Sequence, residues 1–388
     1  MTQGYIEEEH RYLMQTGKKL PVQIVRGAGA YVYDSEGKPY LDLVAGIAVN
    51  ALGHAHPAIL ETIREQAETL VHASGLYYTE APVKLAKRLT ELAFDARVFF
   101  NNSGAEANET AIKLARKWGK KRKDGAYEIV TTYNSFHGRT LAAVTAGGQA
   151  KYSKPFEPLP PGFIHVPWND LAAIKAVTNE RTAAVMLEPI LGESGVRMPA
   201  PGYLEGVRRW CDEQDLLLIL DEVQTGIGRT GRWFAHQHFG IKPDVMTLAK
   251  ALGGGLPIGA VLANQRADVF EPGDHGSTFG GSVLATTVAL TVLDVIEREH
   301  LVEHAAEVGD LLGEAIDELG QQDSRGLGLM RAFTFAEPRA KAFQSKALEL
   351  GVLVNATDDS SIRMVPPLIL QPEHVEEAAA KFKEALEA

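Results

Sequence analysis

The chain has almost no cysteine and no long hydrophobic run. Cys211 is the only cysteine among 388 residues, so no intrachain disulfide can form, as is typical of a reducing compartment. No stretch approaches the roughly 20 apolar residues that a membrane-spanning helix requires. Residues 1–9 are acidic and have no apolar segment, so they do not resemble a signal peptide. We therefore expect a cytoplasmic protein that does not bind membranes.

An excess of positive charge is also absent. The formal net charge is −11, which favours solubility and argues against nucleic acid or an anionic membrane as a partner. We find no internal repeats and no G-x-x-x-x-G-K-[ST] phosphate loop. His54 with His56, and His236 with His238, have the spacing of metal ligands, but no further Cys or His cluster lies nearby. We interpret both pairs as structural and predict no metal site.

The composition is that of a large globular protein. With 45% hydrophobic and 23% charged residues, the chain can bury a substantial core and form two or three domains. Helical and strand patterns alternate in the middle of the chain, which favours a mostly parallel sheet with helices on both faces. The expected helices here are 81–92, 105–118 and 203–212, and the expected strands are 97–100, 128–132, 183–187, 216–220 and 244–248.

The two ends of the chain have different patterns. The N-terminal part predicts a helix, an antiparallel meander and a second helix, and the C-terminal part predicts a smaller α+β domain. We expect residues 1–50 to pack with the small domain, 51–285 to form the large domain and 286–388 the small one. The expected helices are 4–16, 57–70, 282–300, 301–319, 340–350 and 372–386, and the expected strands are 23–25, 30–33, 40–43, 325–334, 352–355 and 362–365.

Two of the expected strands are each followed by a polar residue at the carboxyl end. The apolar run 216–220 leads to Asp221, and the run 244–248 leads to Lys250, which precedes three glycines. Ligands of open α/β sheets bind beyond the carboxyl ends of the strands, so Asp221 and Lys250 are expected to face one crevice. An aspartate here also suits a turn, and a lysine a solvated surface.

Six short blocks, taken together, point to one family. They are 102–109 (NSGAEANE), 135–139 (SFHGR), 188–193 (EPILGE), 221–226 (DEVQTG), 248–255 (LAKALGGG) and 277–281 (STFGG). From about residue 12 to the C-terminus the sequence resembles the class III (subgroup II) aminotransferases, which depend on pyridoxal 5'-phosphate. The resemblance implies an α/β fold of type I, with a mostly parallel, seven-stranded-type sheet flanked by helices and a smaller α+β domain.

The resemblance assigns the groups around the cofactor ring. Lys250 is the catalytic lysine that forms a Schiff base with the cofactor aldehyde, and a desolvated lysine is deprotonated more readily. Asp221 pairs with the protonated pyridine nitrogen, which makes the ring an electron sink. Gln224 reaches the phenolic oxygen, Val223 packs on one ring face, and Phe136 stacks on the other. Taken alone, the block 135–139 would favour an ordinary core residue at Phe136.

The cofactor phosphate is expected at a helix start. Ser103, Gly104 and Ala105 stand between a strand and a helix, where free N–H groups bind phosphate, although a simple serine cap also fits. Glu188 is expected to order the cofactor site. Thr278 is, by resemblance, a phosphate ligand donated by the neighbouring subunit, which implies a homodimer with shared active sites.

The substrate groups follow from the same resemblance. Arg139 matches the distal arginine, which binds the donor's α-carboxylate and the far carboxylate of 2-oxoglutarate. Arg363 matches the proximal arginine for the acceptor's α-carboxylate, and Glu193 matches the glutamate that neutralises it. Ser277 is also expected at the substrate. Ile47 is of the type found in members that act on acetylornithine.

The expected reaction moves the terminal amine of N2-acetyl-L-ornithine, or another acylated ornithine, to 2-oxoglutarate. The products are N-acetyl-L-glutamate 5-semialdehyde and L-glutamate, a step of arginine biosynthesis. Alternatives are donors such as succinylornithine, succinyl-diaminopimelate, ornithine or 4-aminobutyrate. An aminomutase and a cofactor-binding protein without turnover are the remaining alternatives.

Overall fold

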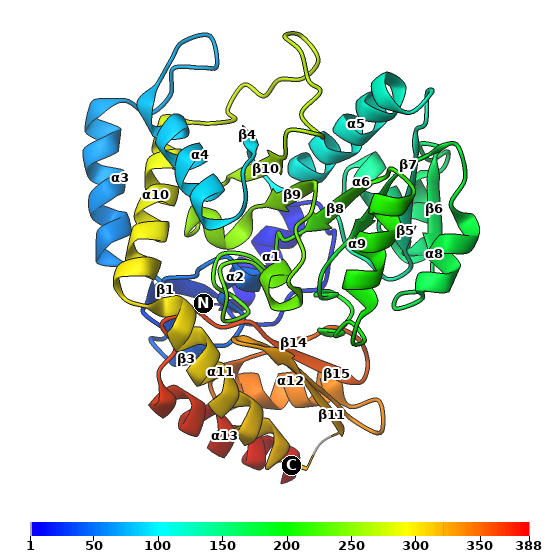
Figure 1. Ribbon diagram of the computed structural model, residues 1–388. Helices are drawn as coiled ribbons and strands as arrows, with labels where there is room; N and C mark the ends of the chain where they lie inside the picture. The colour runs from blue at the N-terminus through cyan, green and yellow to red at the C-terminus, as the bar shows by residue number, and fades with distance from the viewer. Residues whose placement is uncertain (1, 321, 388) are drawn as a thin grey trace.

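The computed structural model describes residues 2–320 and 322–387 and confirms the predicted fold class (Figure 1). A seven-stranded sheet has the order β4-β10-β9-β8-β7-β5-β6. Only β10 runs antiparallel to its neighbours. The strands are β4 (Arg97–Asn101), β5 (Glu128–Thr132), β6 (Phe163–Val166), β7 (Thr182–Leu187), β8 (Leu217–Asp221), β9 (Val245–Leu248) and β10 (Gly259–Ala263).

The unbroken apolar runs exist because the central strands are covered on both faces. Every residue of β8 is buried. Leu217 and Ile219 join a core cluster with α5 (Gly104–Arg122), whereas Leu218 and Leu220 join one on the other face. That second cluster includes α8 (Leu171–Val177) and α9 (Tyr203–Glu213). Each face of the sheet therefore has its own helical layer.

Two smaller sheets complete the fold. Their orders are β1-β2-β3-β13 and β11-β12-β15-β14, and both lie on the side of the C-terminal helices. Their strands are β1 (Ile24–Ala28), β2 (Tyr31–Asp34), β3 (Pro39–Asp42), β11 (Gln322–Leu327), β12 (Met330–Thr334), β13 (Val352–Leu353), β14 (Asn355–Ala356) and β15 (Ser361–Met364). The predicted N-terminal meander is confirmed, because β2 pairs antiparallel with both β1 and β3.

Two strand predictions were wrong. The stretch 325–334 is not one strand but part of the β11–β12 hairpin, because Gly328 has a φ of +53° and turns the chain back. The stretch 352–355 is divided between β13 and β14, which belong to different sheets. The first helix also ends earlier than expected, at Tyr12.

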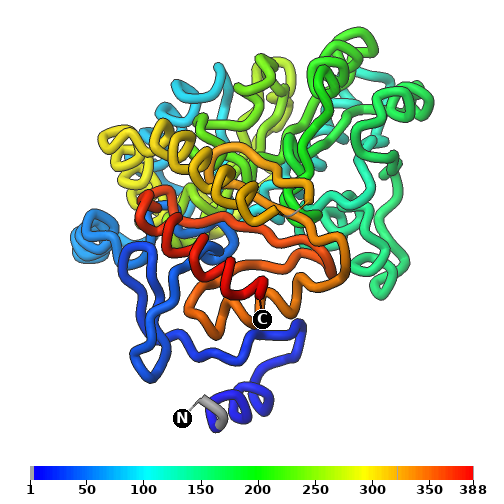
Figure 2. The backbone as a smooth tube through the Cα atoms, turned by 90° about the horizontal axis from the view of Figure 1, so that it is seen from below, coloured from blue at the N-terminus to red at the C-terminus, as the bar shows by residue number. Residues whose placement is uncertain are grey.

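The N-terminal meander and the C-terminal segment form one structural layer. β3 and β13 pair in parallel, with Leu41 opposite Val352. Figure 2 shows the blue N-terminal hairpin beside the red and orange C-terminal elements. The predicted boundary at residue 285 falls inside α10 (Val283–Arg298), which packs on α3 (Pro57–Thr69) and α4 (Glu80–Leu92). The next helix, α11 (Leu301–Asp317), packs instead on α13 (Pro372–Glu387).

The remaining helices surround these sheets, and none among the described residues is long and apolar enough to cross a membrane. They are α1 (Thr2–Tyr12), α2 (Ala45–Ala48), α3 (Pro57–Thr69), α4 (Glu80–Leu92), α6 (Leu141–Ala146), α7 (Ala150–Ser153), α12 (Ala340–Glu349) and α13 (Pro372–Glu387), with 3-10 turns η1 (Lys154–Phe156), η2 (Ala235–Phe239) and η3 (Lys250–Gly253).

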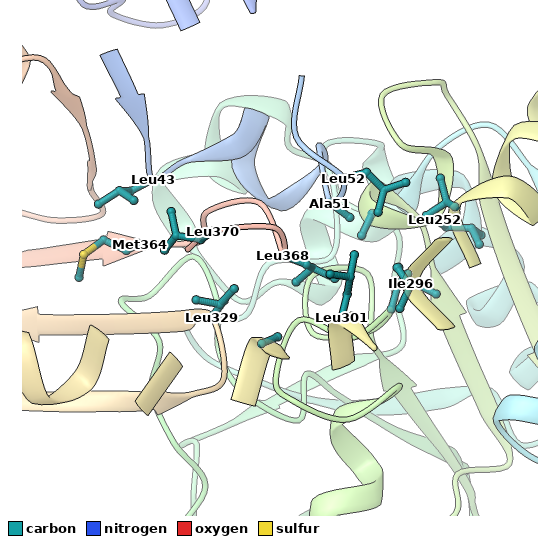
Figure 3. Close-up of a cluster of buried hydrophobic side chains, with 14 of the residues drawn as sticks. Leu43, Ala51, Leu52, Leu252, Ile296, Leu301, Leu329, Met364, Leu368 and Leu370 are labelled. Carbon is teal, nitrogen blue, oxygen red and sulfur yellow. The ribbon is translucent and has the colours of Figure 1, made fainter. Parts of the chain in front are cut away.

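The large and small units share one apolar core. Buried side chains from the N-terminal segment, the large sheet and the C-terminal sheet meet in a single cluster (Figure 3). Burial of this kind contributes roughly 25 cal/mol per Å² of apolar surface. The cluster holds the two units in a fixed relative position. It therefore also fixes the sheet edge where polar residues stand at the ends of β8 and β9. Its labelled members are Leu43, Ala51, Leu52, Leu252, Ile296, Leu301, Leu329, Met364, Leu368 and Leu370.

Arg229 forms polar contacts at the same seam, where the large and small units meet. Its side chain is 1% exposed, and it donates hydrogen bonds to the carbonyl oxygens of Leu329, at 3.0 Å, and Pro366. Burial lowers the pKa of Arg229 to about 9. The loop after β8 is thus attached to the segment that follows β15.

We predict that Arg229→Ala lowers the free energy of unfolding by about 2–4 kcal/mol, because it leaves two buried carbonyl groups unpaired and opens a cavity. Chemical unfolding followed by circular dichroism would measure the change. The exposed neighbour Arg232 provides the control, and Arg232→Ala should shift stability by less than about 0.5 kcal/mol. Equal unfolding midpoints for the two variants would contradict the seam contact.

Candidate active site

A cavity of about 430 Å³ lies where β8 and β9 end. Most of the predicted site residues line it, although they come from segments far apart in the sequence. Ser277, Thr278 and Arg363 are not part of its wall. The predicted residues in the wall are Ser103, Gly104, Ala105, Phe136, Arg139, Glu188, Glu193, Asp221, Val223, Gln224 and Lys250.

Asp221, the last residue of β8, is held by two side chains that the sequence did not single out. Its Oδ2 accepts a hydrogen bond from Nδ2 of Asn108 and pairs with Nδ1 of His137, both at 2.7 Å. Its Oδ1 accepts the N–H of Val223 at 3.0 Å. Burial alone would lower the pKa of His137, but the Asp221 carboxylate raises it overall. His137 thereby keeps a negative charge fixed at the cavity.

Lys250 begins η3, just beyond β9. Within the described residues its ammonium group has no hydrogen bond or ion pair. Burial lowers the pKa of Lys250, and the nearby Glu193 carboxylate offsets this only in part. An amine in such surroundings loses its proton more readily and becomes nucleophilic.

The start of α5 forms a cradle for an anion. Ser103 is the N-cap, and its Oγ accepts the N–H of Glu106 at 3.2 Å. The N–H groups of Gly104 and Ala105 have no acceptor in the part of the chain that the structure describes. A Cβ on Gly104 would lie 2.7 Å from Cγ1 of Val223, so only glycine fits against this wall. Free N–H groups at a helix start suit a phosphate.

Glu188 supports the opposite wall. Its carboxylate accepts the N–H groups of Phe136 at 2.8 Å and Gly192 at 3.0 Å. Burial raises the pKa of Glu188 to about 7. The side chain therefore fixes the backbone that carries Phe136 and the start of the Glu193 loop.

Arg363 lies behind the cavity and is fully buried on β15. It donates to Oε1 of Glu193 at 2.6 Å and to Oδ1 of Asn355 at 2.6 Å. Gln224 joins the pair, since it accepts from Arg363 at 3.1 Å and donates to Glu193 at 3.0 Å. Burial alone would raise the pKa of Glu193, but Arg363 and Lys250 lower it to about 2.

Arg139, like Lys250, lines the cavity without a carboxylate partner among the described residues. Its guanidinium carbon lies 3.8 Å from the ring centroid of Tyr152 and 5.6 Å from that of Phe136. Stacking of this kind orients a guanidinium while leaving its N–H groups free. Tyr152 is a further residue that sequence reasoning missed.

Ser277 and Thr278 lie beside the cavity rather than in its wall. Oγ of Ser277 accepts a hydrogen bond at 3.1 Å from Asn102, which does line the cavity. Thr278 is exposed. The neighbouring ring of Phe279 contacts His72 at a centroid distance of 5.2 Å. The roles predicted for Ser277 and Thr278 remain predictions.

The two pairs of closely spaced histidines form contacts within the fold. His54 bonds to Asp42 at 2.8 Å, and His56 caps the start of α3. His236 bonds to the buried Glu222 at 3.0 Å. These contacts agree with the structural interpretation of both pairs.

Residues 45–48 form an unusual turn beside the cavity. Ala45, Gly46, Ile47 and Ala48 have φ values of 50°, 65°, 65° and 62°, so the chain follows a short left-handed helix. Such a conformation costs roughly 1–2 kcal/mol for each residue other than glycine. The next residue, Val49, lines the cavity.

Comparisons with known proteins agree with this geometry. Residues 12–386 match the family model described as aminotransferase class-III. The chain is 49% identical over 379 residues to the acetylornithine aminotransferase of Caldanaerobacter subterraneus subsp. tengcongensis, covering 96% of each chain. Among solved structures, the acetylornithine aminotransferase of Elizabethkingia anophelis has a TM-score of 0.88 at 36% identity, covering 100% of this chain and 99% of that one. The ornithine aminotransferase of Toxoplasma gondii has a TM-score of 0.95 at 32% identity, with 100% and 95% covered.

The low pKa of Glu193 predicts how stability depends on pH. A carboxyl whose folded pKa lies near 2 rather than 4.5 stabilises the fold above pH 4.5, and this contribution is lost as the pH falls toward 2. Glu193→Gln should therefore destabilise the protein by up to about 3 kcal/mol at pH 7 and progressively less below pH 4.5. Thermal unfolding from pH 8 to 3 would measure this. Glu180→Gln, at an exposed site, should show no such trend, and a difference for Glu193→Gln that is independent of pH would contradict the ion pair.

Proposed function

Because the chain belongs to the class-III aminotransferases, we propose that it transfers the terminal amine of N2-acetyl-L-ornithine to 2-oxoglutarate. The enzyme depends on pyridoxal 5'-phosphate, as this family does. The products are N-acetyl-L-glutamate 5-semialdehyde and L-glutamate, which places the reaction in arginine biosynthesis. High identity over nearly the whole chain to acetylornithine aminotransferases supports this choice of donor.

When bound, the cofactor supplies an electron-poor ring that stabilises negative charge on the substrate carbon. The residues present fit it. The free N–H groups of Gly104 and Ala105 would hold its phosphate, and Asp221 would hold the proton on its ring nitrogen. Val223 and Phe136 would pack on the two ring faces.

Lys250 would attach the cofactor covalently and then move a proton at the reacting carbon. Its lowered pKa supports both tasks, since each needs a neutral amine. In the same cavity, Gln224 would approach the phenolic oxygen of the ring, and Glu188 would keep the Phe136 wall in place.

The difference between the two arginines is the observation that carries the proposal. A donor that reacts at a terminal amine has no carboxylate beside the reacting carbon, and Arg363 is already neutralised by Glu193. The α-carboxylate of the donor, far from the reacting amine, would bind the unpaired Arg139. The acceptor 2-oxoglutarate carries a carboxylate at each end and would bind Arg363 once Glu193 moves aside, with Ser277 near the substrate.

Exposed apolar side chains in two loops support a homodimer. Leu76, Tyr77 and Phe279 are 85%, 71% and 62% exposed, and the exposed Thr278 lies next to Phe279. Exposed apolar side chains of this kind are frequent at protein–protein interfaces. We propose that a second copy covers them and that Thr278 of each subunit completes the other's phosphate site, in a cytoplasmic enzyme.

We expect N2-acetyl-L-ornithine with 2-oxoglutarate to give the highest kcat/KM in a donor panel that includes ornithine, N-succinylornithine, succinyl-diaminopimelate and 4-aminobutyrate. Lys250→Ala is the control, and it should lose turnover by several orders of magnitude while the protein stays folded. Turnover that needs no oxo acid would indicate an aminomutase instead. A higher kcat/KM for another donor would overturn the choice of substrate.

The two half-reactions should separate the two arginines. Arg363→Ala should slow the 2-oxoglutarate half by about 10²-fold and largely spare the donor half, since a charge-assisted contact contributes about 1.5–3 kcal/mol. Arg139→Ala should impair both halves. Stopped-flow absorbance of the bound cofactor, recorded separately with each substrate, would measure the rates. Equal losses in both halves for Arg363→Ala would make Arg363 a general structural charge.

A further inference from the structure

We propose that Asp42 and His54 are positioning residues for the donor side of the cavity. They hold residues 45–48 in the left-handed turn and thereby set an uncharged wall against the N-acyl group of the donor. The inference rests on the proposed function, because it concerns the part of the donor that 2-oxoglutarate lacks.

Asp42 caps the beginning of the turn. It is the last residue of β3 and is 3% exposed. Its Oδ1 accepts the N–H groups of Val44 at 2.9 Å and Ala45 at 2.8 Å, and its Oδ2 bonds to Nε2 of His54 at 2.8 Å. One carboxylate oxygen therefore holds the entry of the turn, and the other is bonded to His54.

His54 connects Asp42 to the N-terminal meander. A Cβ on Gly27 would lie 2.5 Å from Cβ of His54, so the histidine lies directly on the backbone of β1. The backbone of His54 also exchanges two hydrogen bonds with Gly29, at 2.8 and 3.0 Å. These backbone contacts fix the position of His54, so that its ring nitrogen lies within hydrogen-bond distance of Asp42.

The turn needs such support. Three of its four residues carry a Cβ, and left-handed residues other than glycine normally occur singly. Inside the turn the carbonyl oxygen of Ala45 accepts the N–H groups of Val49 at 2.8 Å and Asn50 at 2.9 Å. Ala48 is buried in a cluster with Val365 of the C-terminal segment. Strained backbone of this kind persists where surrounding contacts hold it, commonly at functional sites.

The wall that the turn creates carries no charge. Every side chain from Leu43 to Val49 is apolar or absent, Val49 lines the cavity, and Ile47 is 42% exposed. Arg139 and Lys250 already serve the donor's carboxylate and amine ends, so the acyl group is the remaining part. A neutral wall fits a short neutral acyl group, such as acetyl, better than one that ends in a carboxylate.

The test compares half-reactions in the cofactor-loaded enzyme. His54→Leu removes the hydrogen bond, and we expect the donor half with N-acetylornithine to lose about 10-fold in kcat/KM, mainly through KM, with the 2-oxoglutarate half within about twofold. The preference for N-acetylornithine over N-succinylornithine should shrink. His54→Gln retains an N–H donor and should restore most of the loss.

The meander offers a matched control. Tyr40→Phe removes a hydrogen bond of 2.9 Å to Asp34, away from the turn, and should leave both half-reactions unchanged. Ile47→Gly suits the left-handed conformation and removes the apolar side chain. It should therefore raise the donor KM without lowering the melting temperature, and it keeps the test valid if His54→Leu fails to fold.

Equal losses in both halves, or an unchanged acetyl-to-succinyl preference in both His54→Leu and Ile47→Gly, would overturn the inference and leave the turn as a structural element. Failure of the proposed function has a different signature, because the wild-type enzyme itself would then not prefer N-acetylornithine.

Discussion

Arg363 and Glu193 join the two halves of the molecule at the back of the cavity. Arg363 comes from the C-terminal sheet and Glu193 from the loop after β7, and they meet at 2.6 Å, with Arg363 closed to solvent and Glu193 partly exposed. Removing one partner of a buried ion pair leaves an uncompensated charge, which typically costs several kcal/mol. A group that displaces Glu193 without leaving Arg363 uncompensated needs a negative charge of its own. This requirement couples the shape of the site to the chemistry of its ligand.

The cost of burying an unpaired charge also explains the surroundings of Asp221 and Lys250. Asp221 is buried with His137 and Asn108, so its charge is compensated before any ligand arrives. Lys250 has no ion-pair partner among the described residues, and burial lowers its pKa. Asp221 is therefore a paired anion, whereas Lys250 is an amine that loses its proton more readily than usual.

The sequence predicted those parts of the molecule that depend on local patterns. The unalternating apolar run before Asp221 indicated a strand covered on both faces, and β8 is one. Most predicted site residues lie around a single cavity, because strand ends and helix starts have recognisable neighbours in the sequence. Their chemical roles are still predictions.

The parts that sequence reasoning missed depend on distant contacts. His137 and Asn108 are 84 and 113 residues away from Asp221, and nothing in their own surroundings indicates that pairing. The divided strands β13 and β14 follow from competition between two sheets for one short segment. Of the residues in the left-handed turn, only Gly46 carries a local signal for positive φ.

The position of Arg363 near the end of the chain has a consequence for biosynthesis. Glu193 leaves the ribosome 170 residues before Arg363 does, an interval of roughly 10–30 s at typical elongation rates. Within this interval β8, β9 and β10 are also translated, so the large sheet has all seven strands before the carboxylate of Glu193 meets its cation. Among the described residues the last strand to be translated, β15, therefore supplies the cation of this ion pair, and a chain that stops before it leaves Glu193 at the cavity without that partner.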